Sequence, residues 1–186
     1  MRNKILTKFL LLAVSVFTVV VVGGPAAAGI AIPPVQLWKA LGLPDFVGDA
    51  GRAQWRNDRG KRLAFPGSPA DSRGFVRTMT AELEDGRSYE NVLETHPRWA
   101  ANGWIEGRYH IAAVPADSVF KATVGFLKGA QGTDGVTFEV VFWRGNTVAV
   151  LACVEKTYNG RLWSLTADLS RYAGQEGELV LRVKAG

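Results

Sequence analysis

The stretch Trp104-Ile105-Glu106-Gly107-Arg108-Tyr109 carries the residue types that proteins use to hold sugars. Aromatic rings stack on the flat C–H faces of sugar rings, and neighbouring carboxylates and guanidiniums hydrogen-bond the hydroxyl groups. In an extended strand, alternate side chains point to opposite faces, so Trp104, Glu106 and Arg108 fall on one face. With Ile105 on the core side, these three residues form an exposed binding platform. The alternative is that Trp104 belongs to the core, while Glu106 and Arg108 form a surface ion pair.

Three further aromatic residues are candidates for ligand binding. Trp99 precedes Trp104 by five residues and extends the same surface if it is exposed. Trp143 lies out of phase with the inward-facing side chains of its predicted strand, so it either points outward or caps the end of the strand. Tyr158 lies beside the Asn159-Gly160 turn, at the expected rim of a loop.

No catalytic constellation emerges from the sequence. Cys153 lies inside an apolar run, where a thiol usually packs inertly, and His96 and His110 are the only histidines that could accompany it. The acidic stretch Glu82-Leu83-Glu84-Asp85 lacks the spacing of a jelly-roll glucanase and is typical of a solvated turn. We therefore expect a non-catalytic protein, with a glycoside hydrolase as the remaining enzymatic alternative.

The sequence also predicts no cofactor. It contains no His-x-His pair and no cluster of Cys and His at metal-ligand spacing. Asp134 and Asp168 lie in predicted turns, and oxygen-rich loops suit Ca²⁺. A structural calcium ion is therefore the one metal that the sequence suggests.

Short strands must position these residues, because no helical stripe of useful length appears after Asp45. Apolar residues instead alternate with polar ones, between turns rich in Gly, Asp, Asn and Pro. The pattern predicts about eight or nine short strands, a number typical of a β-sandwich. The candidate strands lie at 54–56, 74–81, 89–94, 104–111, 119–127, 136–143, 147–156, 161–169 and 178–184. This pattern predicts an all-β fold, an antiparallel two-sheet β-sandwich of jelly-roll type.

For two of these strands the sequence makes a specific prediction, namely the position of one in its sheet and the burial of a tryptophan on the other. The strand at 147–156 is almost continuously apolar, which favours a central strand covered on both faces. In the strand that follows, Trp163 is in phase with Leu165 and Ala167, so its side chain is expected in the core.

The N-terminus has the three parts of a secretory signal peptide. Arg2, Lys4 and Lys8 form a basic head. An uncharged apolar run covers residues 9–22, and Ala26-Ala27-Ala28 fits the small-residue cleavage rule. A membrane span needs about 20 apolar residues, so we expect cleavage after Ala28, with an uncleaved anchor as the alternative. The chain then divides into a signal peptide (1–28), an N-terminal extension (29–44) and a β-sandwich domain (45–186), and the mature protein is secreted.

The charge of the chain does not favour a nucleic-acid partner. The whole chain has 22 basic and 17 acidic residues, a net charge of +5. Three of the basic residues and none of the acidic ones lie in residues 1–28, so the remainder has 19 basic and 17 acidic residues and carries +2. Such a weak charge gives no electrostatic footprint for nucleic acid. With the single cysteine, Cys153, no internal disulfide forms, so the core alone must hold the fold.

The second half of the chain is similar to a known group of modules. The segments that carry the similarity are Phe120–Phe126, Asp134–Val140, Leu165–Ser170, Tyr172–Gln175 and Leu179–Val183. They resemble jelly-roll carbohydrate-binding modules, in particular the "novel putative carbohydrate-binding module" group attached to secreted glycosidases. In the first half, Gly74–Arg77, Leu93–Pro97 and Gly103–Tyr109 look like secreted bacterial β-sandwich proteins that share this core. The resemblance covers residues 45–186 and implies carbohydrate binding.

The sequence departs from that group at its C-terminal end. The group usually ends in a further strand with an Asp-Trp pair, whereas this chain stops at Lys184-Ala185-Gly186. The first and last strands of a jelly roll tend to be neighbours, so the segment near Trp55 is expected to present an open edge.

Together these features predict a secreted, non-catalytic binding module that takes glycan or cell-envelope polysaccharide through exposed aromatic residues. The alternative is a structural or adhesive cell-surface protein that contacts other proteins through an open sheet edge. The first function requires aromatic residues gathered on one face, and the second requires a long unpaired edge. An enzyme would require converging carboxylates in a cleft. No nucleic-acid partner is expected, and no membrane span after signal cleavage.

Overall fold

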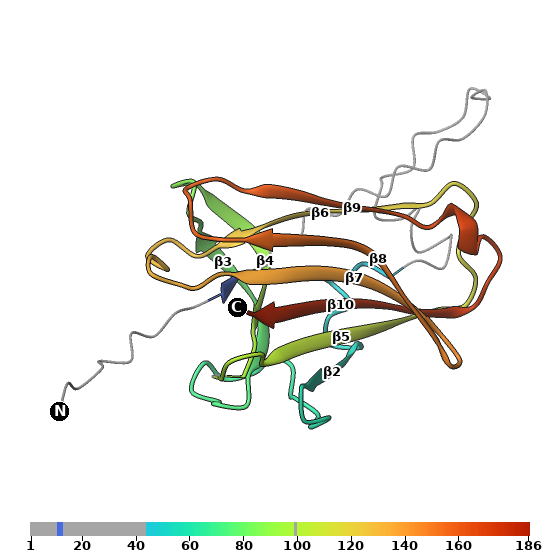
Figure 1. The fold of residues 1–186 in the computed structure, drawn as a ribbon, viewed down its shortest axis with the longest axis horizontal. Helices are drawn as coiled ribbons and strands as arrows, with labels where there is room; N and C mark the ends of the chain where they lie inside the picture. The colour runs from blue at the N-terminus through green and yellow to red at the C-terminus, as the bar shows by residue number, and fades with distance from the viewer. Residues whose placement is uncertain (1–10, 13–43, 99) are drawn as a thin grey trace.

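The computed structural model describes residues 11–12, 44–98 and 100–186. The strands are β1 (Leu11–Leu12), β2 (Gln54–Asn57), β3 (Phe75–Glu82), β4 (Ser88–His96), β5 (Trp104–Ile111), β6 (Val119–Phe126), β7 (Val136–Arg144), β8 (Thr147–Lys156), β9 (Trp163–Asp168) and β10 (Gly177–Ala185), with a short 3₁₀ helix, η1 (Ser170–Tyr172). All the strands pair antiparallel, so the prediction of an all-β chain with antiparallel sheets is confirmed (Figure 1). Within the described residues, no helix is long and apolar enough to cross a membrane.

The largest sheet has five strands in the order β2-β5-β10-β7-β8 (Figure 1). β10 lies at its centre, where Leu181 pairs with Gly107 of β5 on one side and with Val140 of β7 on the other. Because side chains alternate along a strand, Leu179 and Val183 point inward together with Leu181. The alternating apolar side chains that predicted this strand thus pack into the core.

Two smaller sheets cover the inner face of the five-stranded sheet. One has the order β1-β6-β9, and β3 pairs with β4 in the other. Phe120 of β6, Leu165 of β9 and Leu93 of β4 all belong to the same core cluster as the inward residues of β10. Burying a side chain of this size contributes about 1.5–3 kcal/mol, so this shared core holds the sheets together.

β8 is an edge strand, which corrects the prediction of a central strand covered on both faces. Among the described strands it pairs only with β7, and Val148 and Val150 are 49% and 52% exposed. Cys153, expected to pack inertly, is also exposed. A register shift opposite Val140/Val141 inserts an extra residue into β8 and reverses its phase, so apolar residues occupy both faces. An apolar run gives the composition of a strand, but it does not determine how many neighbours that strand pairs with.

Trp163 is exposed, at 42%, which corrects the expectation of a core side chain. Leu165 and Ala167, in phase with it, are buried as expected. Trp163 opens β9 opposite Val124, and the core cluster does not extend to it. The alternation therefore identified the inward face correctly and failed at the first residue of the strand.

The segment near Trp55 does form an edge, because β2 is the outermost strand on its side of the five-stranded sheet. This edge is nevertheless covered. The N–H of Leu63 donates to the carbonyl of Trp55 (3.0 Å), and the N–H of Asn57 donates to the carbonyl of Lys61 (3.1 Å). The chain that follows β2 thus folds back on it and takes up its outward-facing hydrogen bonds.

Candidate functional site

The pairing of β5, β10 and β7 brings four of the predicted site residues together. Trp104, Glu106, Arg108 and Trp143 lie opposite Lys184, Arg182, Val180 and Glu178 of β10, respectively. Paired residues in a sheet face the same side, and this side is the one turned away from the core. The prediction that Trp104, Glu106 and Arg108 share one face is therefore correct, and Trp143 joins them from β7.

A ladder of ion pairs crosses this outward face. Glu106 is buried although it faces outward, because Arg108 Nη2 contacts its Oε1 at 2.6 Å and Arg182 Nη2 contacts its Oε2 at 2.8 Å. Arg182 Nη1 also reaches Glu139 (3.3 Å), which is paired in addition with Lys184. A buried carboxylate is tolerated where each oxygen has a cationic donor. The outward face therefore carries charges of alternating sign that neutralise one another.

The two tryptophans of this face lie beneath guanidinium groups. The Arg108 guanidinium carbon is 3.8 Å from the centre of a Trp143 ring, and that of Arg182 is 5.4 Å from the centre of a Trp104 ring. Such contacts contribute about 0.5–2 kcal/mol. One face of each indole is thus engaged by arginine, which differs from the open aromatic platform that the sequence predicts.

A depression of about 490 Å³ lies at one end of the outward face, beside Trp143. Its lining consists of Arg108, His110, Trp143, Arg144, Gly145, Glu176, Gly177 and Glu178. Small-molecule sites generally occupy roughly 300–1,000 Å³, so the depression has the size of a ligand site. Its two guanidiniums and two carboxylates balance each other in charge.

Two residues of the depression have polar groups open to solvent. The side chains of His110 and Glu176 are 64% and 72% exposed, with Nε2 and Oε1 3.8 Å apart. Glu178 lies 3.7 Å from Arg108 Nη1, and Arg144 donates to the side chain of Gln175 (3.3 Å). The arginines are thus held by neighbours, while the carboxylate of Glu176 and the imidazole of His110 remain open to hydrogen-bond a ligand.

The remaining predicted site residues are not brought to this face. Tyr158 follows β8, whose other end forms the hairpin beside the depression. Its ring is half-buried against the core, 6.2 Å from that of Phe126, and its hydroxyl is hydrogen-bonded by Gln131 (3.4 Å). Trp99 lies outside the described residues.

Sequence reasoning missed a buried ion pair at the end of β3. Glu84, expected in a solvated turn, has a fully buried side chain, and Lys156 Nζ contacts it at 2.8 Å. The carboxylate also accepts the backbone N–H groups of Phe126 (2.9 Å), Asn159 (2.9 Å) and Gly160 (3.0 Å). The pair therefore ties the β3–β4 turn to the loop after β8, a contact between distant residues that no local pattern could reveal.

A second buried carboxylate, Glu94, lies on β4. Burial raises its pKa, opposed by the hydrogen bond that Arg77 Nε donates to Oε2 (2.5 Å) and by the charge of Arg77. Its Oε1 has no hydrogen-bond partner.

The described residues contain no group of three or more His, Cys, Asp or Glu side chains placed to hold a metal ion. Asp168, one of the two suggested calcium ligands, instead accepts the backbone N–H of Ser170 (2.8 Å). That hydrogen bond lowers the pKa of Asp168. A structural calcium ion at Asp134 and Asp168 stays a prediction.

Comparisons with known proteins leave the family of this chain open. No protein-family model matches the sequence, no curated protein matches it, and no solved structure matches its fold. The resemblance to carbohydrate-binding modules therefore stays a prediction.

Proposed function

We propose that this protein is a secreted, non-catalytic module of jelly-roll type that binds glycan or cell-envelope polysaccharide at the outward face of its five-stranded sheet. The depression beside Trp143 carries this proposal, because it places an indole, two guanidiniums and two carboxylates around one hollow of ligand size. Sugars need both an apolar surface for their C–H faces and paired donors and acceptors for their hydroxyls. The signal peptide at residues 1–28 would deliver the domain to the cell surface or the medium.

Each residue has a distinct role in this proposal. Trp143 provides apolar contact with a sugar ring, while Glu176 and Glu178 accept hydrogen bonds from sugar hydroxyls. Arg108 donates hydrogen bonds at the rim and is held there by Glu106 (2.6 Å). Because Arg108 is already oriented in the free protein, less side-chain entropy is lost when a ligand binds.

The test is binding of the full chain, expressed with its own N-terminus in a secreting host, to an array of glycans. We expect binding that falls at least about tenfold in Trp143→Ala, since a buried stacking contact is worth about 1–2 kcal/mol. Trp163→Ala is the matched control, because Trp163 is exposed and lies outside the depression. Absence of binding by a well-folded sample, or an equal loss in both variants, would contradict the proposal.

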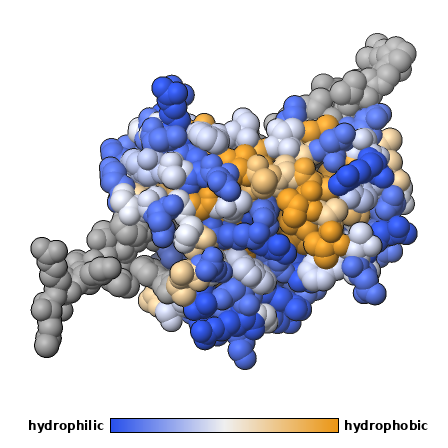
Figure 2. Space-filling view, in the orientation of Figure 1, coloured by the Kyte–Doolittle hydropathy of each residue, from blue (hydrophilic) through white to orange (hydrophobic). Residues whose placement is uncertain are grey.

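A second function, adhesion to other proteins through an exposed strand, is favoured by β8. This edge strand presents Val148 and Val150 to solvent, and Figure 2 shows exposed apolar surface adjoining a hydrophilic band on this side of the molecule. Edge strands with exposed apolar residues tend to pair with other chains, although a bulge such as that of β8 opposes pairing. Val150→Lys should abolish such association and leave glycan binding unchanged.

A further inference from the structure

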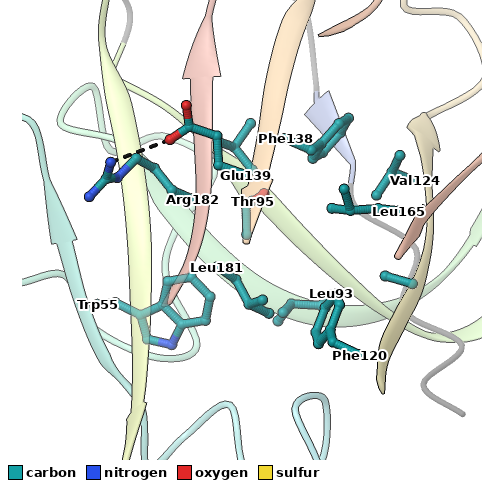
Figure 3. A pocket seen from close by; sticks show the side chains of 12 residues that line it. Trp55, Leu93, Thr95, Phe120, Val124, Phe138, Glu139, Leu165, Leu181 and Arg182 are labelled. Carbon is teal, nitrogen blue, oxygen red and sulfur yellow. Dashed lines mark hydrogen bonds and ion pairs between the residues drawn. The ribbon is translucent and has the colours of Figure 1, made fainter. Parts of the chain in front are cut away.

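The hairpin of residues 54–63, formed where the chain folds back on β2, places two arginines side by side on the outward face. Trp55 and Leu63 belong to the core, and Figure 3 shows Trp55 in the lining of an internal cavity. Because side chains alternate along an extended segment, Arg56 and Arg62 point the opposite way. The two arginines are partners in an antiparallel bridge. They therefore lie at the β2 edge of the outward face.

The backbone brings these two arginines as close together as cross-strand neighbours can come. The hydrogen bonds that the N–H groups of Asn57 (3.1 Å) and Leu63 (3.0 Å) donate across the hairpin flank the pair and do not join it. Arg56 and Arg62 thus form a non-hydrogen-bonded pair, in which the Cα atoms are about 4.5 Å apart and the side chains approach most closely. Like charges directly opposite each other destabilise a sheet. The hairpin therefore holds two positive charges together at a cost in stability.

No carboxylate neutralises this pair. None of the ion pairs in the described part of the chain includes Arg56 or Arg62. Glu106 of β5 lies directly opposite Arg56. Its Oε1 is already held by Arg108 and its Oε2 by Arg182. The ladder of alternating charges thus ends at Glu106 and leaves the β2 edge positive.

The guanidinium of Arg56 also has unused hydrogen-bonding capacity. Its Nε is shielded from water and has no hydrogen-bond partner, and its Nη2 donates only a long hydrogen bond to Gln54 (3.4 Å). An arginine side chain carries five N–H donors, and Arg62 presents its own to solvent. Charge-assisted hydrogen bonds from guanidinium to an oxyanion are among the strongest in proteins. An oxyanion placed between Arg56 and Arg62 would relieve their repulsion and accept hydrogen bonds from both.

The remaining charges of the hairpin add to this positive surface. Arg59 and Lys61 lie in its turn, and both are exposed. Asp58 is the only acidic residue of the hairpin, and Arg98 from outside it contacts Asp58 Oδ2 at 2.6 Å. The acid is therefore already neutralised, and the hairpin keeps a surplus of positive charge in a chain whose charges otherwise nearly cancel.

We propose that Arg56 and Arg62 form an oxyanion subsite, and that the glycan bound at the outward face is an acidic polysaccharide whose carboxylate, sulfate or phosphate groups this subsite takes. The inference rests on the proposed glycan binding and names the class of glycan. Gln54 lies opposite Arg108, which lines the depression beside Trp143. Arg56 is two residues further along β2, a distance of about 7 Å. A polymer that occupies the depression can therefore reach the two arginines along the same face.

The test is an array in which each acidic glycan is printed beside a neutral counterpart, made by methyl esterification of its carboxylates or by removal of its sulfate or phosphate groups. The protein is the full chain, expressed with its own N-terminus in a secreting host. We expect it to bind acidic glycans at least about fivefold more tightly than their counterparts, the effect of one favourable charge contact. The preference should disappear in about 0.5 M NaCl, because salt at this concentration screens exposed charges. The rows of the array show which of the three oxyanions is preferred.

Two variants locate the subsite. Arg56→Gln and Arg62→Gln should each lower the affinity for acidic glycans about fivefold and leave that for the neutral counterparts unchanged. Each should unfold in urea at the same concentration as the parent or a higher one, because the repulsion between the two arginines is removed. Arg161→Gln is the matched control: it removes the same charge from an exposed residue after β8, at the opposite edge of the five-stranded sheet.

The outcomes separate this inference from the proposed function. Equal binding of acidic and neutral glycans, or a preference that survives in both arginine variants, would overturn the subsite while glycan binding stands. An equal loss in Arg161→Gln would reduce the preference to general attraction by a positive protein. Tighter binding of an oligonucleotide included on the array would identify nucleic acid as the ligand instead. Binding of no glycan at all by the folded parent would contradict the proposed function itself.

Discussion

Glu84 and Glu94 are both buried carboxylates, but they have very different surroundings. Every side of the Glu84 carboxylate has a donor: Lys156 and three backbone N–H groups. Glu94 receives one bond from Arg77, and its Oε1 has no hydrogen-bond partner. The carboxylate of Glu84 is thus fully compensated for the loss of water, whereas that of Glu94 is not.

The difference shows in which part of the molecule the buried carboxylate oxygens all have hydrogen-bond donors. Glu84 ties together three segments, namely the β3–β4 turn, the end of β6 and the loop after β8. Glu94 and its neighbour Thr95 each carry a buried side-chain atom without a hydrogen-bond partner, and both lie on β4. Unpaired buried polar atoms are uncommon in native proteins, so β4 is the less well compensated of these two regions.

The largest loss of stability is expected for Lys156→Met. It leaves the Glu84 carboxylate buried without its cation, and removing one partner of a buried ion pair costs about 3–5 kcal/mol. Urea unfolding followed by circular dichroism measures the loss. The double variant Glu84→Gln/Lys156→Met should recover part of it, because no uncompensated charge remains. A loss below about 1 kcal/mol would show that the three backbone N–H groups alone compensate the buried Glu84 carboxylate.

A smaller effect is expected at the ion-pair ladder. Glu106→Gln removes the charge shared by Arg108 and Arg182, whose side chains are 16% and 18% exposed and so keep some water. We expect a loss of about 2 kcal/mol, the range of hydrogen bonds to charged groups. The glycan affinity should fall as well, because Arg108 is no longer held beside the depression. A variant with reduced stability and unchanged glycan binding would remove Arg108 from the proposed site.

The smallest effect belongs to Glu94→Gln. Burial raises the pKa of Glu94 above its ordinary value of 4.5, so the folded protein holds this proton more tightly than the unfolded chain. Stability therefore decreases as pH rises from about 4.5 through the raised pKa, and it is constant above that window. The variant should lack this slope and match or exceed the parent at pH 7, by less than about 1 kcal/mol. Urea midpoints at pH 4 and pH 7 measure it, and a steeper slope in the variant would contradict the assignment.

The strands and their faces were largely predictable from the sequence. Alternation along 104–111 correctly placed Trp104, Glu106 and Arg108 on one face, because the side-chain period of a strand is a local property. The Asn159-Gly160 pair predicted a β-hairpin, and this was wrong: Gly160 does have a positive φ of 74°, but the segment connects β8 to β9, which belong to different sheets. For the candidate site, local pattern identified three residues of the outward face, and Trp143 as one of two alternatives.

The neighbours of each strand were not predictable. The apolar composition of β8 is the same at an edge as in the centre of a sheet, so only the pairing of β7 with β10 decided that Val148 and Val150 face water. Likewise, no residue near Glu84 in the sequence indicates that its carboxylate pairs with Lys156. Pairings between distant segments depend on the relative position of whole sheets, which a single strand does not encode.

The amino-acid sequence by itself thus determined where the strands run, which of their faces are apolar, and that the N-terminus has the form of a signal peptide. The tertiary structure alone decided that Arg108 covers Trp143, that Arg182 joins Glu106 to Glu139, and that β8 lies at an edge of its sheet. The physical reason is range: alternation and turn chemistry act between residues a few positions apart. Ion pairs, stacking and unfilled edges depend on which segments the shared core brings side by side.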